Sequence, residues 1–151
     1  MPPDPQWLEA RDLDTWRCWL RLAADLPAAL HRQLAEDCGI SLQDYDVLVQ
    51  LSEAPGGRLR ISALAEAVHW ERSRLSHHVT RMVERQLVSR ESCEADGRGS
   101  FVVLTGHGAA VLTAAAPGHV AAVRALFFGG LSPKERRALG ELLAKVEAQL
   151  R

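Results

Sequence analysis

A basic stripe runs along residues 72–86 of this 151-residue chain. Its members recur at the intervals i, i+3, i+4, i+7 and i+11, which place side chains on one face of an α-helix. An apolar stripe follows the same helical period and is centred roughly 120° away from the basic one. Cations on an exposed helix face can bind phosphates and base edges of DNA, although such a face is more often merely solvated. The basic stripe is Arg74, His77, His78, Arg81 and Arg85, and the apolar stripe is Leu75, Val79, Met82 and Val83.

Further features favour DNA binding over a merely solvated face. Small hydroxyl side chains, Ser73 and Ser76 among them, lie beside the basic stripe and can contact phosphates or base edges. Further along the chain, Arg98 stands between two glycines, from where its guanidinium can reach into a narrow minor groove. Asp96 can hold that guanidinium by a charge-assisted hydrogen bond. The residues that we expect to bind DNA are Arg60, Arg72, Ser73, Arg74, Ser76, His77, His78, Arg81, Arg90, Asp96 and Arg98.

The elements that must position these side chains follow from periodicity, caps and turn residues. A long first helix is expected, with Pro27 as a kink or restart and Gly39 as its stop. Ser41-Leu42-Gln43-Asp44 and Ser132-Pro133-Lys134-Glu135 have the form of capping boxes, so each opens a helix. A glycine-rich turn between two extended stretches predicts a β-hairpin. The expected helices cover about 9–37, 41–53, 60–68, 72–86, 106–128 and 132–151, and the expected strands 87–93 and 100–104.

Two short helices followed by a hairpin have the order of a winged helix-turn-helix, in which the second helix enters the major groove. The fold class is therefore mainly α with a small β-hairpin wing. The predicted reading helix is residues 72–86, and the predicted wing tip is Asp96-Gly97-Arg98-Gly99.

The region from His69 to Gly108 resembles the core of MarR-type transcription regulators. The resemblance implies a repressor that binds a pseudo-palindromic operator as a homodimer, joined through its first and last two helices, and that a small-molecule effector releases. Residues 1–37 would then be an N-terminal arm and dimerisation helix, 38–105 the winged lobe, and 106–151 the C-terminal dimerisation helices. One departure is Gln86, where the family usually has glycine, so we expect a different turn there. The matching pieces are Leu64-Ala65-Glu66-Ala67-Val68, Ser73-Arg74-Leu75-Ser76-His77, Thr80-Arg81-Met82-Val83-Glu84, Leu87-Val88-Ser89-Arg90, Asp96-Gly97-Arg98 and Val103-Leu104-Thr105-Gly106-His107-Gly108.

Aromatic side chains near the start of the chain are candidates for an effector pocket. Trp16 and Trp19 lie one helical turn apart, and Tyr45 is the only tyrosine. The resemblance suggests a pocket for a small aromatic effector, lined by these three residues. Packing in the core or in a dimer interface is the commoner role of such a pair.

Other function classes find less support. Cys18 could make the first helix a redox sensor, since it lies between Arg17 and Arg21, but a buried inert thiol is the alternative. The histidines lack the spacing of a metal site, and no cofactor is expected. No phosphate-binding loop, nucleophile elbow or paired carboxylates point to an enzyme. A protein-interaction or antirepressor module without DNA binding stays open as an alternative.

Bulk composition sets the remaining limits. The formal net charge of −1 and the pI near 6.6 argue against a protein that coats nucleic acid non-specifically, so binding must rest on a local face. The start has no signal-peptide pattern, and no stretch is expected to reach the roughly 20 apolar residues of a membrane span. We therefore expect a cytoplasmic protein without membrane partners, whose partners are double-stranded DNA and a second copy of itself.

Overall fold

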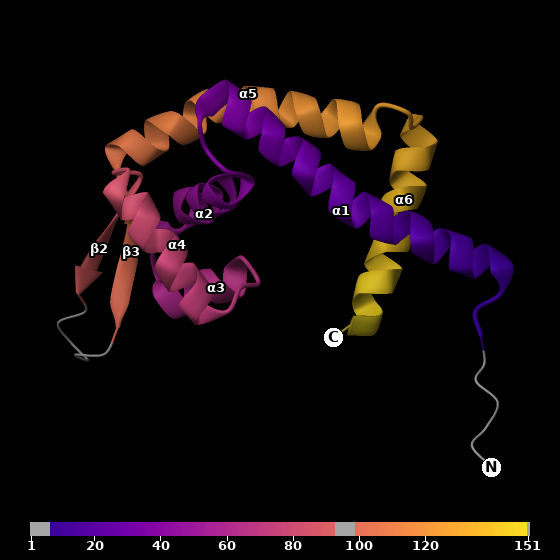
Figure 1. Cartoon of the computed structure of the whole chain (residues 1–151), viewed down its shortest axis with the longest axis horizontal. Helices are drawn as coiled ribbons and strands as arrows, with labels where there is room; N and C mark the ends of the chain where they lie inside the picture. Colours follow the sequence, from indigo (N-terminus) through magenta and orange to yellow (C-terminus); the bar gives the residue numbers. More distant parts are fainter. Residues whose placement is uncertain (1–6, 93–98, 151) are drawn as a thin grey trace, which may run out of the picture. The chain divides into compact units, whose positions relative to one another are not determined.

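The computed structural model describes residues 7–92 and 99–150 (Figure 1). Two compact units make up the chain: Met1–Leu30 with Ala121–Arg151, and His31–Val120. The described residues are mostly helical with one small antiparallel sheet, which confirms the predicted fold class. In chain order the elements are α1 (Ala10–Cys38), α2 (Leu42–Glu53), η1 (Pro55–Gly57), β1 (Arg58–Arg60), α3 (Ile61–Ala67), α4 (Arg72–Glu84), β2 (Val88–Ser92), β3 (Ser100–Leu104), α5 (Gly106–Phe128), α6 (Pro133–Glu147) and η2 (Ala148–Leu150).

The helix starts and stops follow the local signals in the sequence. Ser41 and Ser132 both form complete capping boxes, as predicted. Gly39 ends α1 with φ of 65°, a left-handed conformation that glycine adopts without steric cost. Pro27 lies inside α1, and the helix continues through it to Cys38 rather than restarting.

The sheet contains one strand more than the predicted hairpin. Its order is β1-β3-β2, and all neighbours are antiparallel. Residues 58–60 were expected to lead directly into a helix, but they form β1, in which Leu59 pairs with Val102. Gly56 and Gly57 have φ of 69° and 66°, and these left-handed turns carry the chain from α2 back to the sheet. The middle strand β3 is therefore hydrogen-bonded along both of its edges, to β1 on one side and to β2 on the other.

The core of the His31–Val120 unit lies between α2, α3, α4 and the sheet. The predicted apolar stripe of α4 faces this core, with Leu75, Val79 and Met82 fully buried. Burying a large apolar side chain stabilises the fold by roughly 1.5–3 kcal/mol. This burial fixes which faces of α4 remain available for a ligand. The other fully buried side chains of the cluster are Val47, Leu48, Leu51, Leu64, Val88 and Val102.

The end of α4 corrects the expectation for Gln86. Gln86 takes the left-handed conformation with φ of 60°, so the turn does not differ from the one that glycine would make. Its amide donates to Val83 O at 2.9 Å, and the amide of Leu87 donates to Met82 O at 3.0 Å, which is a Schellman motif. Buried Leu87 and the Thr105 hydroxyl, 2.6 Å from Gln86 O, hold the strained residue in place.

The helix α5 corrects a second expectation. By length and composition α5 could cross a membrane, although the sequence was expected to hold no such stretch. A single helix of this kind is weak evidence of a span. Among the described residues, it is the one helix that passes this test.

The junction between α4 and α5 brings two backbones into direct contact. Thr105 caps α5, since the amide of Gly108 donates to its Oγ1 at 2.9 Å. Thr105 Oγ1 also lies 2.9 Å from Leu87 O. A Cβ on Gly108 would lie 2.0 Å from that same carbonyl oxygen, far inside van der Waals contact. The Leu-Thr-x-x-Gly pattern of residues 104–108 therefore has a structural reason: it supplies a cap and a close approach.

We predict that Gly108→Ala lowers the free energy of unfolding by about 2–3 kcal/mol, because α5 must move away from Leu87. Urea denaturation at fixed protein concentration measures the change. Gly106→Ala is the matched control, since a Cβ there meets nothing within 4 Å. Equal stability of the two variants would contradict the close approach.

Candidate nucleic-acid interface

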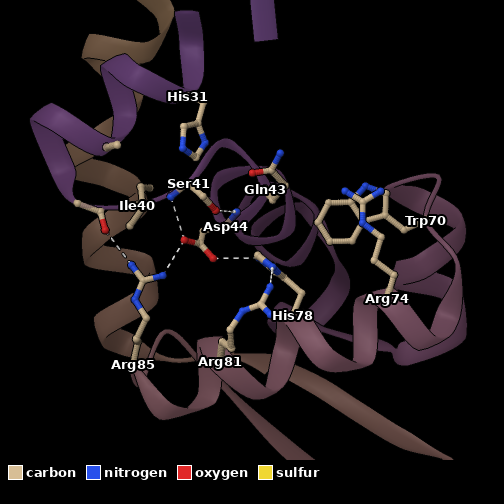
Figure 2. A pocket seen from close by; sticks show the side chains of 12 residues that line it. His31, Ile40, Ser41, Gln43, Asp44, Trp70, Arg74, His78, Arg81 and Arg85 are labelled. Carbon is tan, nitrogen blue, oxygen red and sulfur yellow. Dashed lines mark hydrogen bonds and ion pairs between the residues drawn. The ribbon is translucent and has the colours of Figure 1, made fainter. Parts of the chain in front are cut away.

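The helix α4 presents two different surfaces besides its core face. Ser73, His77 and Thr80 are exposed and lie opposite the buried stripe of α4. A second surface turns toward α2 and the end of α1, where it lines a pocket of about 560 Å³ (Figure 2). The single basic stripe of the sequence is thus divided between open solvent and a pocket. The pocket residues are His31, Ala35, Gly39, Ile40, Ser41, Gln43, Asp44, Trp70, Arg74, His78, Arg81 and Arg85.

A buried carboxylate, Asp44, stands at the centre of this pocket and is only 2% exposed. Its Oδ2 accepts from the backbone amide of Ser41 at 2.9 Å and from Arg85 Nη1 at 2.7 Å. Its Oδ1 lies 2.9 Å from His78 Nε2. Arg85 also donates through Nη2 to Gly39 O at 2.9 Å. The carboxylate therefore joins the start of α2 to two residues of α4 (Figure 2).

The ionisation of Asp44 follows from these contacts. Burial alone would raise the pKa of this carboxyl, because a charge is poorly solvated in the interior. The hydrogen bonds from His78, Ser41 and Arg85 outweigh burial and hold the pKa of Asp44 well below its usual range. Asp44 is consequently ionised, and acts only as an acceptor, at any pH at which the protein would work.

His78 occupies the pocket, not the open surface where a DNA contact was expected. Its side chain is 12% exposed. Its Nδ1 lies 3.1 Å from Arg81 Nη2, and the edge of its ring meets Trp70 with 5.3 Å between centroids. Arg74 stacks over Trp70, 4.5 Å from the ring centroid. A second expected DNA residue thus contacts an aromatic ring of the turn between α3 and α4.

The sheet is fastened to α4 by Arg90 on β2. Arg90 Nη2 donates to Ser76 O at 2.7 Å and lies 3.2 Å from Thr80 Oγ1. The Thr80 hydroxyl in turn donates to Ser76 O at 3.0 Å. Because Arg90 bridges the hairpin and the middle of α4, the two elements have a fixed relation on this surface.

The remaining expected DNA residues fall in three places. Arg72 is exposed at the start of α4. Arg60 ends β1, with its guanidinium carbon 5.4 Å from the centroid of Phe101. Asp96 and Arg98 lie outside the described residues.

The three candidate effector residues do not belong to one unit. Trp16 and Trp19 are half-exposed in the Met1–Leu30 unit, where they line an apolar pocket of about 490 Å³ with Leu143 and Val146 of α6. Tyr45 belongs to the His31–Val120 unit. There it is buried, with its ring 4.3 Å from that of His119.

The structure also bears on redox sensing at Cys18 and on metal binding. Cys18 is exposed on α1 and is a free thiol. Within residues 7–92 and 99–150, no group of three or more His, Cys, Asp or Glu side chains could hold a metal ion.

Sequence reasoning found most of these side chains but missed the role of Asp44. The capping box identified its bonds to Ser41, three residues away. The partner Arg85 lies 41 residues further along the chain, and no local pattern connects the two positions. The interval of seven residues between His78 and Arg85 was the available signal, because it places both on the same side of α4.

Comparisons with known proteins show the family and the fold. The sequence profile of the MarR family matches residues 39–99. Transcriptional regulator HosA of Escherichia coli is 37% identical over 103 residues, which are 68% of this chain and 73% of HosA. Sco3205, a MarR family transcriptional regulator from Streptomyces coelicolor solved in complex with DNA, has 42% identity and a TM-score of 0.91, over 97% of this chain and 92% of Sco3205. BpsR of Bordetella bronchiseptica shares the fold, with a TM-score of 0.78 at 22% identity, over 89% of this chain and 98% of BpsR, and its structure is described with regulation of DNA binding by 6-hydroxynicotinic acid.

We predict that Asp44→Asn lowers the free energy of unfolding at pH 7 by about 2–4 kcal/mol, because Arg85 loses its buried anionic partner and the contact with His78 is weakened. The folded-state pKa of Asp44 is lowered, so its stabilisation is present above the unfolded pKa of about 4 and is lost as the pH falls through the folded pKa. The stability difference between wild type and variant should therefore shrink as the pH falls below about 4. Urea denaturation between pH 7 and pH 2.5 measures it.

The matched control is Asp46→Asn, which removes an exposed carboxylate from the same helix. It should cost less than about 0.5 kcal/mol. A constant difference between wild type and Asp44→Asn across the acid range would contradict the assignment.

Proposed function

The chain belongs to the MarR family of transcription regulators, and from this premise we propose that it represses genes by binding a pseudo-palindromic operator as a homodimer. It is a regulator and not an enzyme. The observation that carries the proposal is the exposed side of α4, where the open surface adjoins the exposed arginines Arg72, Arg74 and Arg81, and which Arg90 holds to the sheet. A relative at 42% identity with the same fold is known in complex with DNA.

The charge distribution supports a local binding face on a nearly neutral chain. Residues 72–90 contain five arginines and a single acid, Glu84, whereas the whole chain has a net charge of −1. Neutralisation of phosphates by such a face gives affinity without a strongly basic protein. Non-specific binding should therefore be modest.

The α4 residues divide into proposed roles by their exposure. Ser73 and His77 lie on the open surface and are assigned to base edges or nearby phosphates. Arg74 and Arg81 are exposed at the rim of the pocket, from where their guanidinium groups can reach guanine or phosphate. Arg72 at the start of α4 is assigned to the backbone of the DNA. Further proposed DNA residues are Arg60, Ser76, Arg90, Asp96 and Arg98.

A second copy of the chain is the proposed occupant of the apolar surface of the Met1–Leu30 and Ala121–Arg151 unit. Leu20, Leu126 and Leu142 are about half exposed or more. Apolar side chains clustered in this way on a soluble protein mark an interaction surface. The homodimer that the resemblance implies would cover them, with residues 1–37 and 106–151 as its dimerisation region.

A small aromatic effector is the proposed release signal. The pocket at Trp16 and Trp19 is apolar and offers two indole rings for stacking. The shared fold of BpsR, with its described regulation by 6-hydroxynicotinic acid, suggests the class of ligand. A protein-interaction or antirepressor module that lacks DNA binding is the alternative, together with redox sensing at exposed Cys18.

For operator binding, we predict that Arg74→Ala and Arg81→Ala each weaken binding to a selected operator by about 1–3 kcal/mol. Arg98→Ala should instead lower the salt slope of binding by about one phosphate contact. Fluorescence anisotropy with an operator selected from a genomic library measures both, and sedimentation should find two chains per duplex. Glu53→Gln at the exposed end of α2 is the control and should leave the affinity unchanged.

Unchanged affinity in all three variants would contradict this interface. If the wild type selects no sequence at about 100 mM salt and captures a protein partner instead, the interaction module replaces the proposal.

For the effector, we predict that 6-hydroxynicotinic acid or another small aromatic acid or phenol raises the melting temperature and weakens operator binding. A ligand shifts the equilibrium only if it binds one state more tightly than the other. Cyclohexanecarboxylate is the control of similar size without an aromatic ring. An absence of both effects across a panel of such acids and phenols would remove the effector from the proposal.

A further inference from the structure

We infer that Asp44 and His78 form a relay that orients the guanidinium of Arg81 for DNA. The inference rests on the proposed function, because it assumes that α4 contacts DNA. Asp44 and His78 are positioning residues in this relay, and Arg81 is the residue that touches the ligand. Figure 2 shows the three side chains in order, with dashed lines from Asp44 to His78 and from His78 to Arg81.

The first step of the relay fixes the tautomer of His78. His78 Nε2 lies 2.9 Å from the ionised Asp44 Oδ1, outside the angular range of a hydrogen bond, and this proximity favours a proton on Nε2 because a lone pair there would face a negative charge. A neutral imidazole carries one N–H, which leaves Nδ1 as an acceptor. The buried acid therefore decides what the opposite edge of the ring can bind.

The second step uses that acceptor. Arginine has only donors, and Arg81 Nη2 lies 3.1 Å from His78 Nδ1, so Arg81 donates to the ring. One hydrogen bond leaves most of the five donors of a guanidinium for other partners. Because Arg81 is exposed, those donors are accessible from solvent. The relay thus holds Nη2 of the Arg81 guanidinium and leaves its remaining donors for groups in a DNA groove.

Neighbouring groups hold His78 in this orientation. Arg85 engages the other oxygen of Asp44, and Trp70 packs against the ring edge. Among the described residues, the titratable or charged groups that line the same pocket are His31, Asp44, Arg74, His78, Arg81 and Arg85.

Preorganisation is the consequence for recognition. A guanidinium that is already held in one plane loses less freedom when it makes two parallel bonds to guanine. Non-specific phosphate contacts need no such plane. The relay should therefore affect the preference for the operator more than general affinity for DNA.

Removal of the ring breaks the relay in a defined way. Glutamine at position 78 lacks the imidazole that joins Asp44 to Arg81. The preference for the operator should therefore fall in His78→Gln, with less change in binding to a scrambled duplex.

The experiment measures the affinity ratio between the selected operator and a scrambled duplex at pH 7.5 for the full-length protein. We expect His78→Gln to lower this ratio roughly tenfold, which corresponds to one weakened arginine contact. In a double-mutant cycle, His78→Gln should add nothing to Arg81→Ala.

A second measurement keeps the result independent of DNA. Nitrogen NMR of the histidine rings at pH 7.5 should find His78 as the Nε2–H tautomer, assigned by its absence in His78→Gln. The Nδ1–H tautomer, additive losses in the cycle, or an unchanged affinity ratio in a folded His78→Gln would overturn the relay. A wild type that has no operator preference would overturn the proposed function, and the relay to DNA with it, whatever the tautomer.

Discussion

A carboxylate removed from water must be paired, and Asp44 satisfies this requirement in a way that organises the whole surface around it. Its partners come from the start of α2, from the middle of α4 and from the end of α4. Removing any one of them would leave a buried charge incompletely compensated. The angle between α2 and α4 is therefore tied to an electrostatic constraint in addition to the packing of Leu75 and Val79.

The need to pair Asp44 also separates two kinds of basic residue on α4. Arg85 and His78 face the carboxylate and serve the fold, whereas His77 faces solvent and Arg81 lies at the border between the two. Charge alone does not distinguish these roles, since the residues are neighbours on one helix. Their roles follow from their different partners. A residue that contacts Asp44 would lose that internal contact on binding a phosphate, whereas the exposed His77 would not.

The parts of the fold that depend on local chemistry could be predicted from the sequence. Capping boxes at Ser41 and Ser132, and the apolar stripe of α4, act within a few residues and were recognised. The strand β1 was missed because three residues carry no periodicity, and its pairing with β3 is made across more than 40 positions. The direction of His78 was missed for the same reason, because an amphipathic pattern identifies a face but not the residue that faces it from another helix.

The contact between Gly108 and Leu87 has a mechanical consequence. The start of α5 lies directly on the carbonyl that follows the end of α4, with no side chain between the two backbones to absorb a displacement. Side chains between two helices can change rotamer and so accommodate a displacement of one helix. Two backbones in direct contact cannot do this. A rotation of α5 at Gly108 would therefore displace Leu87 and, with it, the C-terminal end of α4. The junction would behave as a rigid connection between the two helices and not as a flexible hinge.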